Sequence, residues 1–131
     1  MKAFVLEDDP ERIKQFKKRF AEKNWEYVIV SDVVSAIKAL STITFNILFL
    51  DHDLGGEVYV DILNSNTGSE LARWISDNGV KGDPVVIIHS LNTVGQAYMS
   101  SLIKNPFVIP FVWTKNIFDS KIQIGKEDND V

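Results

Sequence analysis

Five short apolar runs divide the chain, and an amphipathic or polar segment separates each run from the next. The runs are Ala3–Leu6, Tyr27–Val30, Ile47–Leu50, Val85–Ile88 and Phe107–Trp113. The segments between them carry apolar residues at helical spacing, as at Ile13, Phe16 and Phe20. Alternating strands and helices predict a doubly wound α/β domain, with a five-stranded parallel sheet and helices on both faces.

Capping signals mark where several of these helices should begin. Pro10 suits the first turn of a helix, and the acidic residues before it suit the N-terminus. The later helices should start at Ser31–Asp32, at Thr67 and at Asn92–Thr93, where the side chains are of the N-cap type. The basic residues between Lys14 and Arg19 are interpreted as a solvated helix face.

The end of the chain carries weaker structural signals. The segment Asn116–Val131 is short and polar, so we expect the last helix of the fold to be short or missing. Residues 126–131 are predicted to form a disordered tail, which leaves residues 1–125 as a single domain. A length of 131 residues fits one domain of ordinary size.

Composition narrows the class of protein. The net charge of −4 argues against a broad nucleic-acid-binding surface, and the absence of cysteine excludes disulfides and thiolate metal sites. Acidic residues interrupt the N-terminal apolar run, unlike a signal peptide, and no apolar stretch is long enough to cross a membrane. We therefore expect a cytoplasmic protein with no membrane partner.

Polar side chains gather where the predicted strands end, which is the edge where ligands bind in open parallel sheets. These residues are Glu7, Asp8, Asp9, Asp51, His52, Asp53, His89, Ser90, Thr114 and Lys115. Clustered carboxylates repel one another unless a cation neutralises them, and hard oxygen ligands favour Mg²⁺ or Mn²⁺. The alternative is that the carboxylates cap helices or carry solvated loop charge, which explains Asp9 but not Asp51.

Four segments, in order along the chain, resemble the motifs of a response-regulator receiver domain. They are the acidic segment Val5–Pro10, the phosphoacceptor-like segment Phe49–Asp51, the strand that begins at Pro84, and the basic pair Thr114–Lys115. The resemblance implies a flavodoxin-like receiver fold. It also implies that Glu7 and Asp8 hold Mg²⁺, that Asp51 ligates it too, and that Lys115 holds phosphoryl oxygens.

Three features depart from the receiver pattern. His89 stands where receivers carry Thr or Ser, the usual Pro is missing after Lys115, and the loop that follows Asp51 is long. The inserted stretch Glu57–Leu63 alternates enough to form a small hairpin or flap over the site. A loop that fills the core is an equal alternative.

The segments Leu50–Leu54 and His89–Asn92 resemble one group of receiver-like domains, the cyclic-phosphate-processing receivers. This resemblance implies action on cyclic phosphates in RNA repair or conflict systems. It adds Asp53 to the candidate metal ligands and makes His52 and His89 candidate acid–base groups, because histidine suits proton transfer near neutral pH. The alternatives are that His52 hydrogen-bonds the loop backbone and that His89 is structural.

Two functions follow from these resemblances. In the first, a metal-dependent domain processes a cyclic phosphate or related phosphoester: Asp51 ligates the metal or acts as nucleophile, His89 transfers a proton, and Lys115 stabilises developing charge. The alternative is a single-domain response regulator that is phosphorylated on Asp51 in two-component-type signalling. The intact acidic site disfavours a degenerate interaction module. Expected partners are a phosphate-containing small molecule or an RNA end, and a partner protein that Trp113 is placed to contact.

Overall fold

The five apolar runs become the five strands of one sheet in a computed structural model that describes residues 1–56, 59–114 and 118. The strands are β1 (Lys2–Leu6), β2 (Glu26–Val30), β3 (Ile47–Leu50), β4 (Val85–Ile88) and β5 (Phe107–Val108). The helices are α1 (Pro10–Lys23), α2 (Val33–Thr42), α3 (Gly68–Asn78), α4 (Thr93–Leu102) and the short 3₁₀ helix η1 (Phe111–Trp113).

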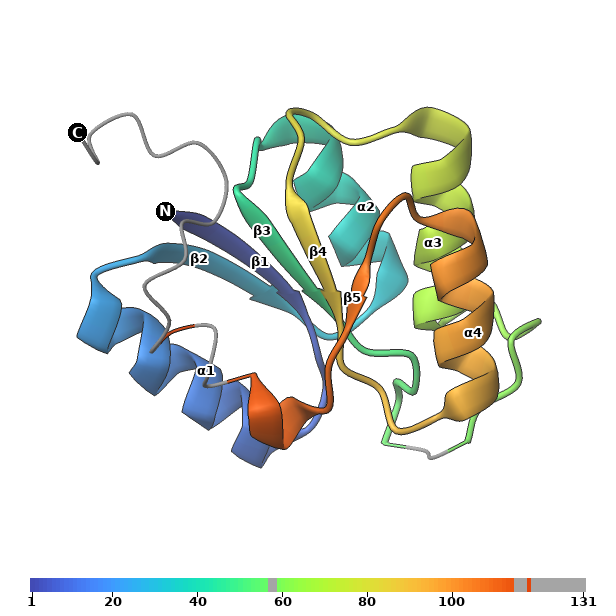
Figure 1. Ribbon diagram of the computed structural model, residues 1–131, viewed down its shortest axis with the longest axis horizontal. Helices are drawn as coiled ribbons and strands as arrows, with labels where there is room; N and C mark the ends of the chain where they lie inside the picture. The colour runs from blue at the N-terminus through green and yellow to red at the C-terminus, as the bar shows by residue number, and fades with distance from the viewer. Residues whose placement is uncertain (57–58, 115–117, 119–131) are drawn as a thin grey trace.

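The strand order β2-β1-β3-β4-β5 is that of a flavodoxin-like doubly wound sheet, and every neighbouring pair of strands is parallel. Helix α1 covers one face of the sheet, and α2, α3 and α4 cover the other (Figure 1). The predicted fold is therefore confirmed. The direction of winding switches between β1 and β3, which is the place where such folds bind ligands.

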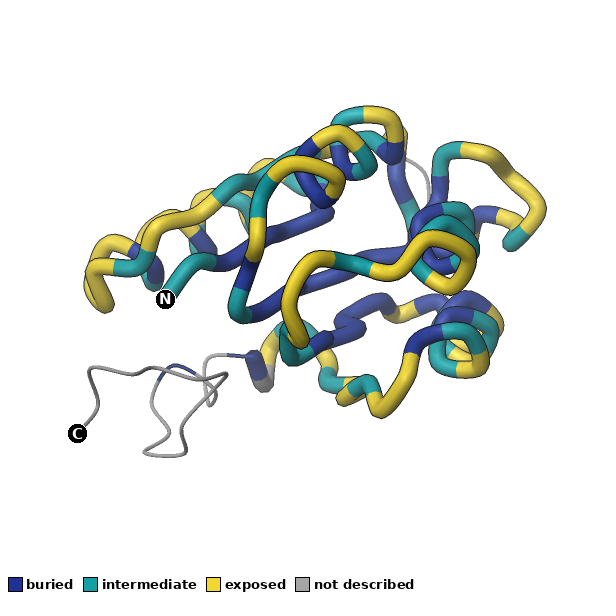
Figure 2. The backbone as a smooth tube through the Cα atoms, turned by 90° about the horizontal axis from the view of Figure 1, so that it is seen from above, coloured by how far each residue is buried: buried dark blue, intermediate teal, exposed yellow. Residues whose placement is uncertain are grey.

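The sheet separates two hydrophobic layers. Successive strand residues point to opposite faces, so Phe4 and Leu48 pack against α2, α3 and α4, whereas Val5 and Phe49 pack on the α1 side. On that side the ring of Phe20 lies 6.2 Å from the ring of Phe49, measured between centroids. The central strands β1, β3 and β4 are buried along most of their length, and Figure 2 shows such buried stretches between segments of intermediate and exposed residues.

Helices α1, α2, α3 and α4 each begin at a residue whose side chain accepts a hydrogen bond from the first turn. These N-cap residues are Asp9, Asp32, Thr67 and Asn92. The predicted helix starts are therefore confirmed. Because Asp9 follows β1 and Asn92 follows β4 closely, the two caps hold the N-termini of α1 and α4 at the same edge of the sheet.

The fifth strand is shorter than the apolar run predicted. It pairs with β4 over Phe107–Val108, and the backbone N–H of Ile109 extends the ladder by donating to Ile88 at 2.9 Å. Pro110 follows, and a proline has no N–H to donate to a strand. The apolar run, which Pro110 interrupts, is therefore a strand only in its first half, and its remainder turns into η1.

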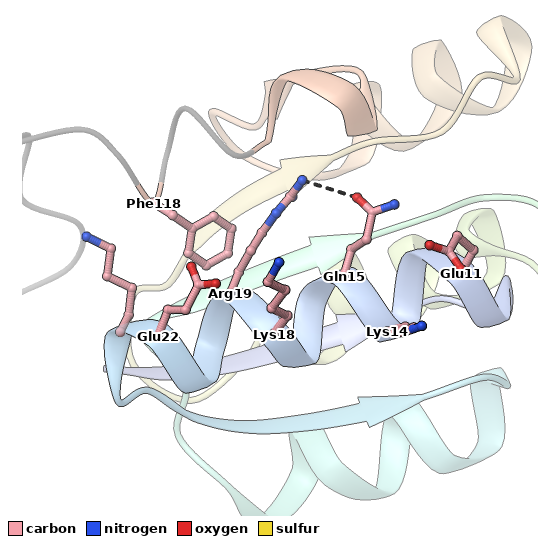
Figure 3. A pocket seen from close by; sticks show the side chains of 8 residues that line it. Glu11, Lys14, Gln15, Lys18, Arg19, Glu22 and Phe118 are labelled. Carbon is pink, nitrogen blue, oxygen red and sulfur yellow. Dashed lines mark hydrogen bonds between the residues drawn. The ribbon is translucent and has the colours of Figure 1, made fainter.

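The basic face of α1 is solvated at its lysines but not at Arg19. The Arg19 guanidinium donates to Oγ1 of Thr114 at 2.8 Å and lies 5.1 Å from the ring centroid of Phe111. Beside it, α1 and Phe118 line a groove of about 480 Å³ (Figure 3). Arg19 therefore joins α1 to the segment after β5, and the prediction of a wholly solvated face is wrong at this residue.

Several predictions fall on positions that the structure does not describe. The last helix and the tail at 126–131 lie outside the described residues, as do residues 57 and 58 of the predicted hairpin. Residues 59–66 form turns and bends, with no strand among them. No helix in the described part of the chain is long and apolar enough to cross a membrane.

Replacing Phe20 with alanine should show how much the α1 layer contributes. Phe20 is fully buried, so Phe20→Ala should lower the free energy of unfolding by about 3–5 kcal/mol in urea denaturation. The control is Val34→Ala, since Val34 is 81% exposed on α2 and should change the value by less than about 0.5 kcal/mol. Equal losses in both variants would show that α1 packs loosely.

Candidate active site

Three polar side chains meet where the three central strands end. Glu7 follows β1, Asp51 follows β3 and His89 follows β4, and these strands are neighbours in the sheet. Each residue offers one carboxylate oxygen or ring nitrogen, and these atoms all lie within 4.8 Å of one another. All three residues are buried, with exposures of 0%, 3% and 1%. The sheet therefore brings together three of the residues that sequence reasoning singled out.

The Glu7 carboxylate is completely buried, and hydrogen-bond donors surround it. Nε2 of His89 lies 3.0 Å from its Oε1. The backbone N–H groups of Asp8 and Asp9 both donate to Oε2 at 3.1 Å. These contacts come from β4 and from the turn before α1, so they fix the position of the carboxylate at the end of β1.

Arg12 of α1 joins the two carboxylates. Its Nε donates to Oε1 of Glu7 at 2.9 Å, and its Nη2 lies 3.2 Å from Oε2 of Glu7 and 3.5 Å from Oδ2 of Asp51. The guanidinium is also 5.8 Å from the ring centroid of Phe111. The Arg12 side chain is 28% exposed, so it lies between the buried carboxylates and solvent.

Sequence reasoning did not identify Arg12. Its position held a usable signal: Arg12 is the third residue after the N-cap Asp9, in the first turn of a helix that starts directly after the acidic strand end. A long side chain in that turn can reach back over the strand end. Basic residues on an exposed helix are usually solvated, however, and pattern alone does not separate the two cases.

The ring of His89 lies beside two aromatic rings. Its centroid lies 5.6 Å from that of Phe16 and 6.2 Å from that of Phe111. A carboxylate only accepts hydrogen bonds, so the contact with Glu7 requires the proton on Nε2. Nδ1 is buried and has no hydrogen-bond partner among the described residues. His89 is thus oriented with one nitrogen toward the carboxylates.

The two carboxylates have opposite electrostatic environments. Burial alone would raise the pKa of Glu7, but its hydrogen bond to His89 and the charges of His89 and Arg12 outweigh burial and lower this pKa to about 2. Burial and the charge of Glu7 raise the pKa of Asp51 from 3.8 to about 8, although Arg12 opposes the rise. In the absence of a metal, Glu7 is therefore ionised at neutral pH and Asp51 is largely protonated.

Asp51 is fixed by a close packing of backbone around it. The N–H of His52 donates to Oδ1 of Asp51 at 2.8 Å, and the N–H of Gly68 donates to the carbonyl of His52 at 2.9 Å. A Cβ atom at Gly68 would lie 2.2 Å from the Asp51 carbonyl oxygen. Glycine at this position therefore allows α3 to begin directly against the site.

His52 and Asp53 form a second network beside the first. Nδ1 of His52 lies 2.9 Å from Oδ1 of Asp53, and Nδ2 of Asn92 donates to the same Asp53 oxygen at 3.0 Å. Asp53 also accepts the backbone N–H groups of Tyr59 at 2.6 Å and Val60 at 3.0 Å. The network ties the long loop after β3 to the start of α4.

The remaining sequence-predicted residues take different positions. Asp53 is occupied by this loop network and is not part of the Glu7–Asp51–His89 group. Asp8 lies at the rim, where its Oδ2 accepts the N–H of Gly56 at 2.6 Å. Lys115 lies outside the described residues, and so does the side chain of Trp113.

The donor set of the cluster fits a divalent cation. Two buried carboxylates offer hard oxygen ligands, and an imidazole nitrogen lies within reach of both. Burial of two acids side by side is unfavourable, as the raised pKa of Asp51 shows, and a cation relieves that repulsion. Glu7 and Asp51 are therefore the residues that can hold one, and His89 lies beside them.

Comparison with protein families gives the class of domain. A sequence model of the cyclic-phosphate processing receiver domain matches residues 4–105, which is more than half of the chain. The chain belongs to this family of receiver domains. The matched segment runs from β1 to just beyond α4, so it contains Glu7, Arg12, Asp51 and His89. The resemblance stated from the sequence is confirmed.

Solved receiver structures share the fold. A phosphorylated cyanobacterial phytochrome response regulator is 19% identical over 95% of this chain and 98% of its own, with a TM-score of 0.68. The receiver domain of a sensor histidine kinase from Pseudomonas aeruginosa, with magnesium in its active-site cleft, is 12% identical over 90% and 93% of the two chains, with a TM-score of 0.67. A Thermotoga maritima response regulator in complex with Mg²⁺ and BeF is 18% identical over 90% and 94%, with a TM-score of 0.64. No curated protein matches the sequence.

The raised pKa of Asp51 predicts an unusual pH dependence for the metal-free receiver. Between pH 4 and 8 the unfolded chain has lost this proton and the folded chain retains it, so stability falls as pH rises. The free energy of unfolding should drop by about 4 kcal/mol between pH 5 and pH 9. The lowered pKa of Glu7 has the opposite effect: it makes the free energy of unfolding fall as the pH drops below about 4.5.

The control for this pH dependence is Asp51→Asn, which cannot ionise and should remove most of the drop. Urea denaturation at several pH values, with a chelator present, gives both curves. A wild-type protein with equal stability at pH 5 and pH 9 would show that Asp51 is ionised in the fold.

Gly95 tests the packing around His52. A Cβ at Gly95 would lie 2.4 Å from Cγ of the buried His52 ring. Gly→Ala usually stabilises a helix, but Gly95→Ala should destabilise this one by about 1–3 kcal/mol because the ring has no room to move. Val94→Ala, at an exposed position of the same turn, is the control and should be close to neutral. A gain in thermal stability for Gly95→Ala would contradict the described packing.

Proposed function

We propose that this receiver domain uses a bound divalent cation, Mg²⁺ or Mn²⁺, to process a cyclic phosphate or a related phosphoester. The observation that carries the proposal is the contact between Nε2 of His89 and Oε1 of Glu7 at 3.0 Å, within a cluster that also contains Asp51. It combines metal-binding carboxylates with a residue suited to proton transfer. Family membership supports the same substrate class.

The residues that would hold the cation are Glu7 and Asp51, with His89 within reach and Asp8 at the rim. When bound, the cation supplies polarisation of a phosphoryl oxygen. The similar receiver structures from Pseudomonas aeruginosa and Thermotoga maritima contain magnesium, and their shared fold supports this assignment. Asp51 would act as a ligand or as the nucleophile, and Lys115 would hold phosphoryl oxygens, as the receiver motif implies.

His89 supplies the proton-transfer step in this proposal. Its ring is fixed by Phe16 and Phe111, so Nε2 has a constant direction toward the site. A group held in this way can protonate or deprotonate an oxygen of the substrate without first losing rotational freedom. His52 is buried and bonded to Asp53, which supports a positioning role for it rather than contact with substrate.

The second candidate function is signalling, in which Asp51 accepts a phosphoryl group and a partner protein recognises the change. The phosphorylated phytochrome response regulator among the similar structures favours it. His89 stands against it, because the hydroxyl that bonds the phosphoryl group in receivers is replaced here. Incubation with Mg²⁺ and either a 2′,3′-cyclic nucleotide or acetyl phosphate separates the two functions.

His89→Ala should lower turnover of a cyclic phosphate by about a hundredfold or more, because a general acid–base group contributes at least that much. Metal affinity, followed by the shift in melting temperature with MgCl₂, should change much less. A wild type that hydrolyses none of a panel of cyclic phosphates, together with a His89→Thr variant that accumulates phospho-Asp51, would reverse the assignment in favour of signalling.

A further inference from the structure

We propose that Arg12 has two alternative partners: it neutralises Glu7 and Asp51 in the metal-free protein, and it binds the substrate phosphate once the carboxylates hold a cation. This inference deepens the proposed function and rests on it. Arg12 lies outside the residues that the receiver motifs identify, and its role follows from its contacts.

Hydrogen-bond donors occupy every acceptor site of the Glu7 carboxylate. Oε1 accepts from Nε of Arg12 and faces Nε2 of His89. Oε2 accepts from Nη2 of Arg12 and from the N–H groups of Asp8 and Asp9. A carboxylate has about four lone-pair sites, and these five contacts use all of them. Glu7 can therefore coordinate a cation only after Arg12 leaves.

The Arg12 guanidinium and a bound cation would compete for the same position. The guanidinium spans the two carboxylates, at 3.2 Å from Glu7 and 3.5 Å from Asp51, so it holds the position where a cation would be coordinated. A guanidinium and a metal cation that contact the same buried carboxylates repel each other strongly. Glu7 retains His89 and two backbone donors without Arg12, so its buried carboxylate stays hydrogen-bonded when the arginine moves away.

The Arg12 guanidinium can move toward solvent when it leaves the carboxylates. The carboxylates are buried, but the Arg12 side chain is 28% exposed, so its path leads outward toward solvent. The guanidinium already lies 5.8 Å from the ring centroid of Phe111, which offers it a cation–π surface that does not depend on the carboxylates. A guanidinium at the mouth of the site presents paired N–H donors, and this geometry matches two oxygens of a phosphate.

The test compares Arg12→Met, which keeps the length and loses the charge, with Arg12→Lys, which keeps the charge and loses the paired donors. Binding of MgCl₂ alone is measured by calorimetry and by the shift in melting temperature. Arg12→Met should bind Mg²⁺ about tenfold more tightly than wild type, because the competing cation is gone. Lys14→Met, at an exposed position of α1, is the matched control and should equal wild type.

The second measurement is the affinity for inorganic phosphate in saturating Mg²⁺. Here Arg12→Met should bind about tenfold more weakly, and Arg12→Lys should fall between the two, because a lysine gives a point charge without the paired geometry. In wild type, the NMR signal of the Arg12 Nε–H should shift when Mg²⁺ is added without phosphate. This readout keeps the test valid if Arg12→Met folds poorly.

The outcomes separate this inference from the proposed function. A wild type that binds neither Mg²⁺ nor Mn²⁺ removes the metal site itself. A wild type that binds Mg²⁺ with no shift in the Arg12 Nε–H signal, or an Arg12→Met variant with unchanged Mg²⁺ affinity, overturns the exchange of partners and leaves the metal site standing. Unchanged phosphate affinity in Arg12→Met overturns the phosphate-binding role.

Discussion

Burying the carboxylate of Glu7 without partners would strongly disfavour folding, because an ionised group loses its hydration in the protein interior. The structure meets this constraint with contacts from three elements: the turn that begins α1, Arg12 within α1, and His89 after β4. The end of β1, the start of α1 and the end of β4 are therefore held in one arrangement by a single side chain.

Asp51 is the second buried acid at this edge of the sheet. Among the described residues, Arg12 and the backbone N–H of His52 donate to it, and the charge of Glu7 acts against its ionisation. The site thus combines one carboxylate that is fully compensated with another that is not. Active sites commonly retain such unfavourable electrostatics, because the same groups bind a ligand that relieves them.

The sheet and the convergence of the site residues could be predicted because both follow from local pattern. Apolar runs give parallel strands, and the carboxyl ends of adjacent parallel strands meet, so Glu7, Asp51 and His89 had to be close. The contacts of Arg12 could not be predicted, because the reach of a long side chain depends on the exact position of α1. Pro110, which interrupts the fifth apolar run, is the visible cause of the short β5.

The side chain of Asn92 has a consequence for how the site can open. Its Oδ1 caps α4 through the N–H of Gly95, and its Nδ2 holds the carbonyl of Val60 and the carboxylate of Asp53. Moving the loop after β3 away from α4 breaks contacts of the same side-chain amide that caps the N-terminus of α4. Loop opening and fraying of the first turn of α4 are therefore coupled through one side-chain amide, and hydrogen exchange at the amide of Gly95 reports on the helix end.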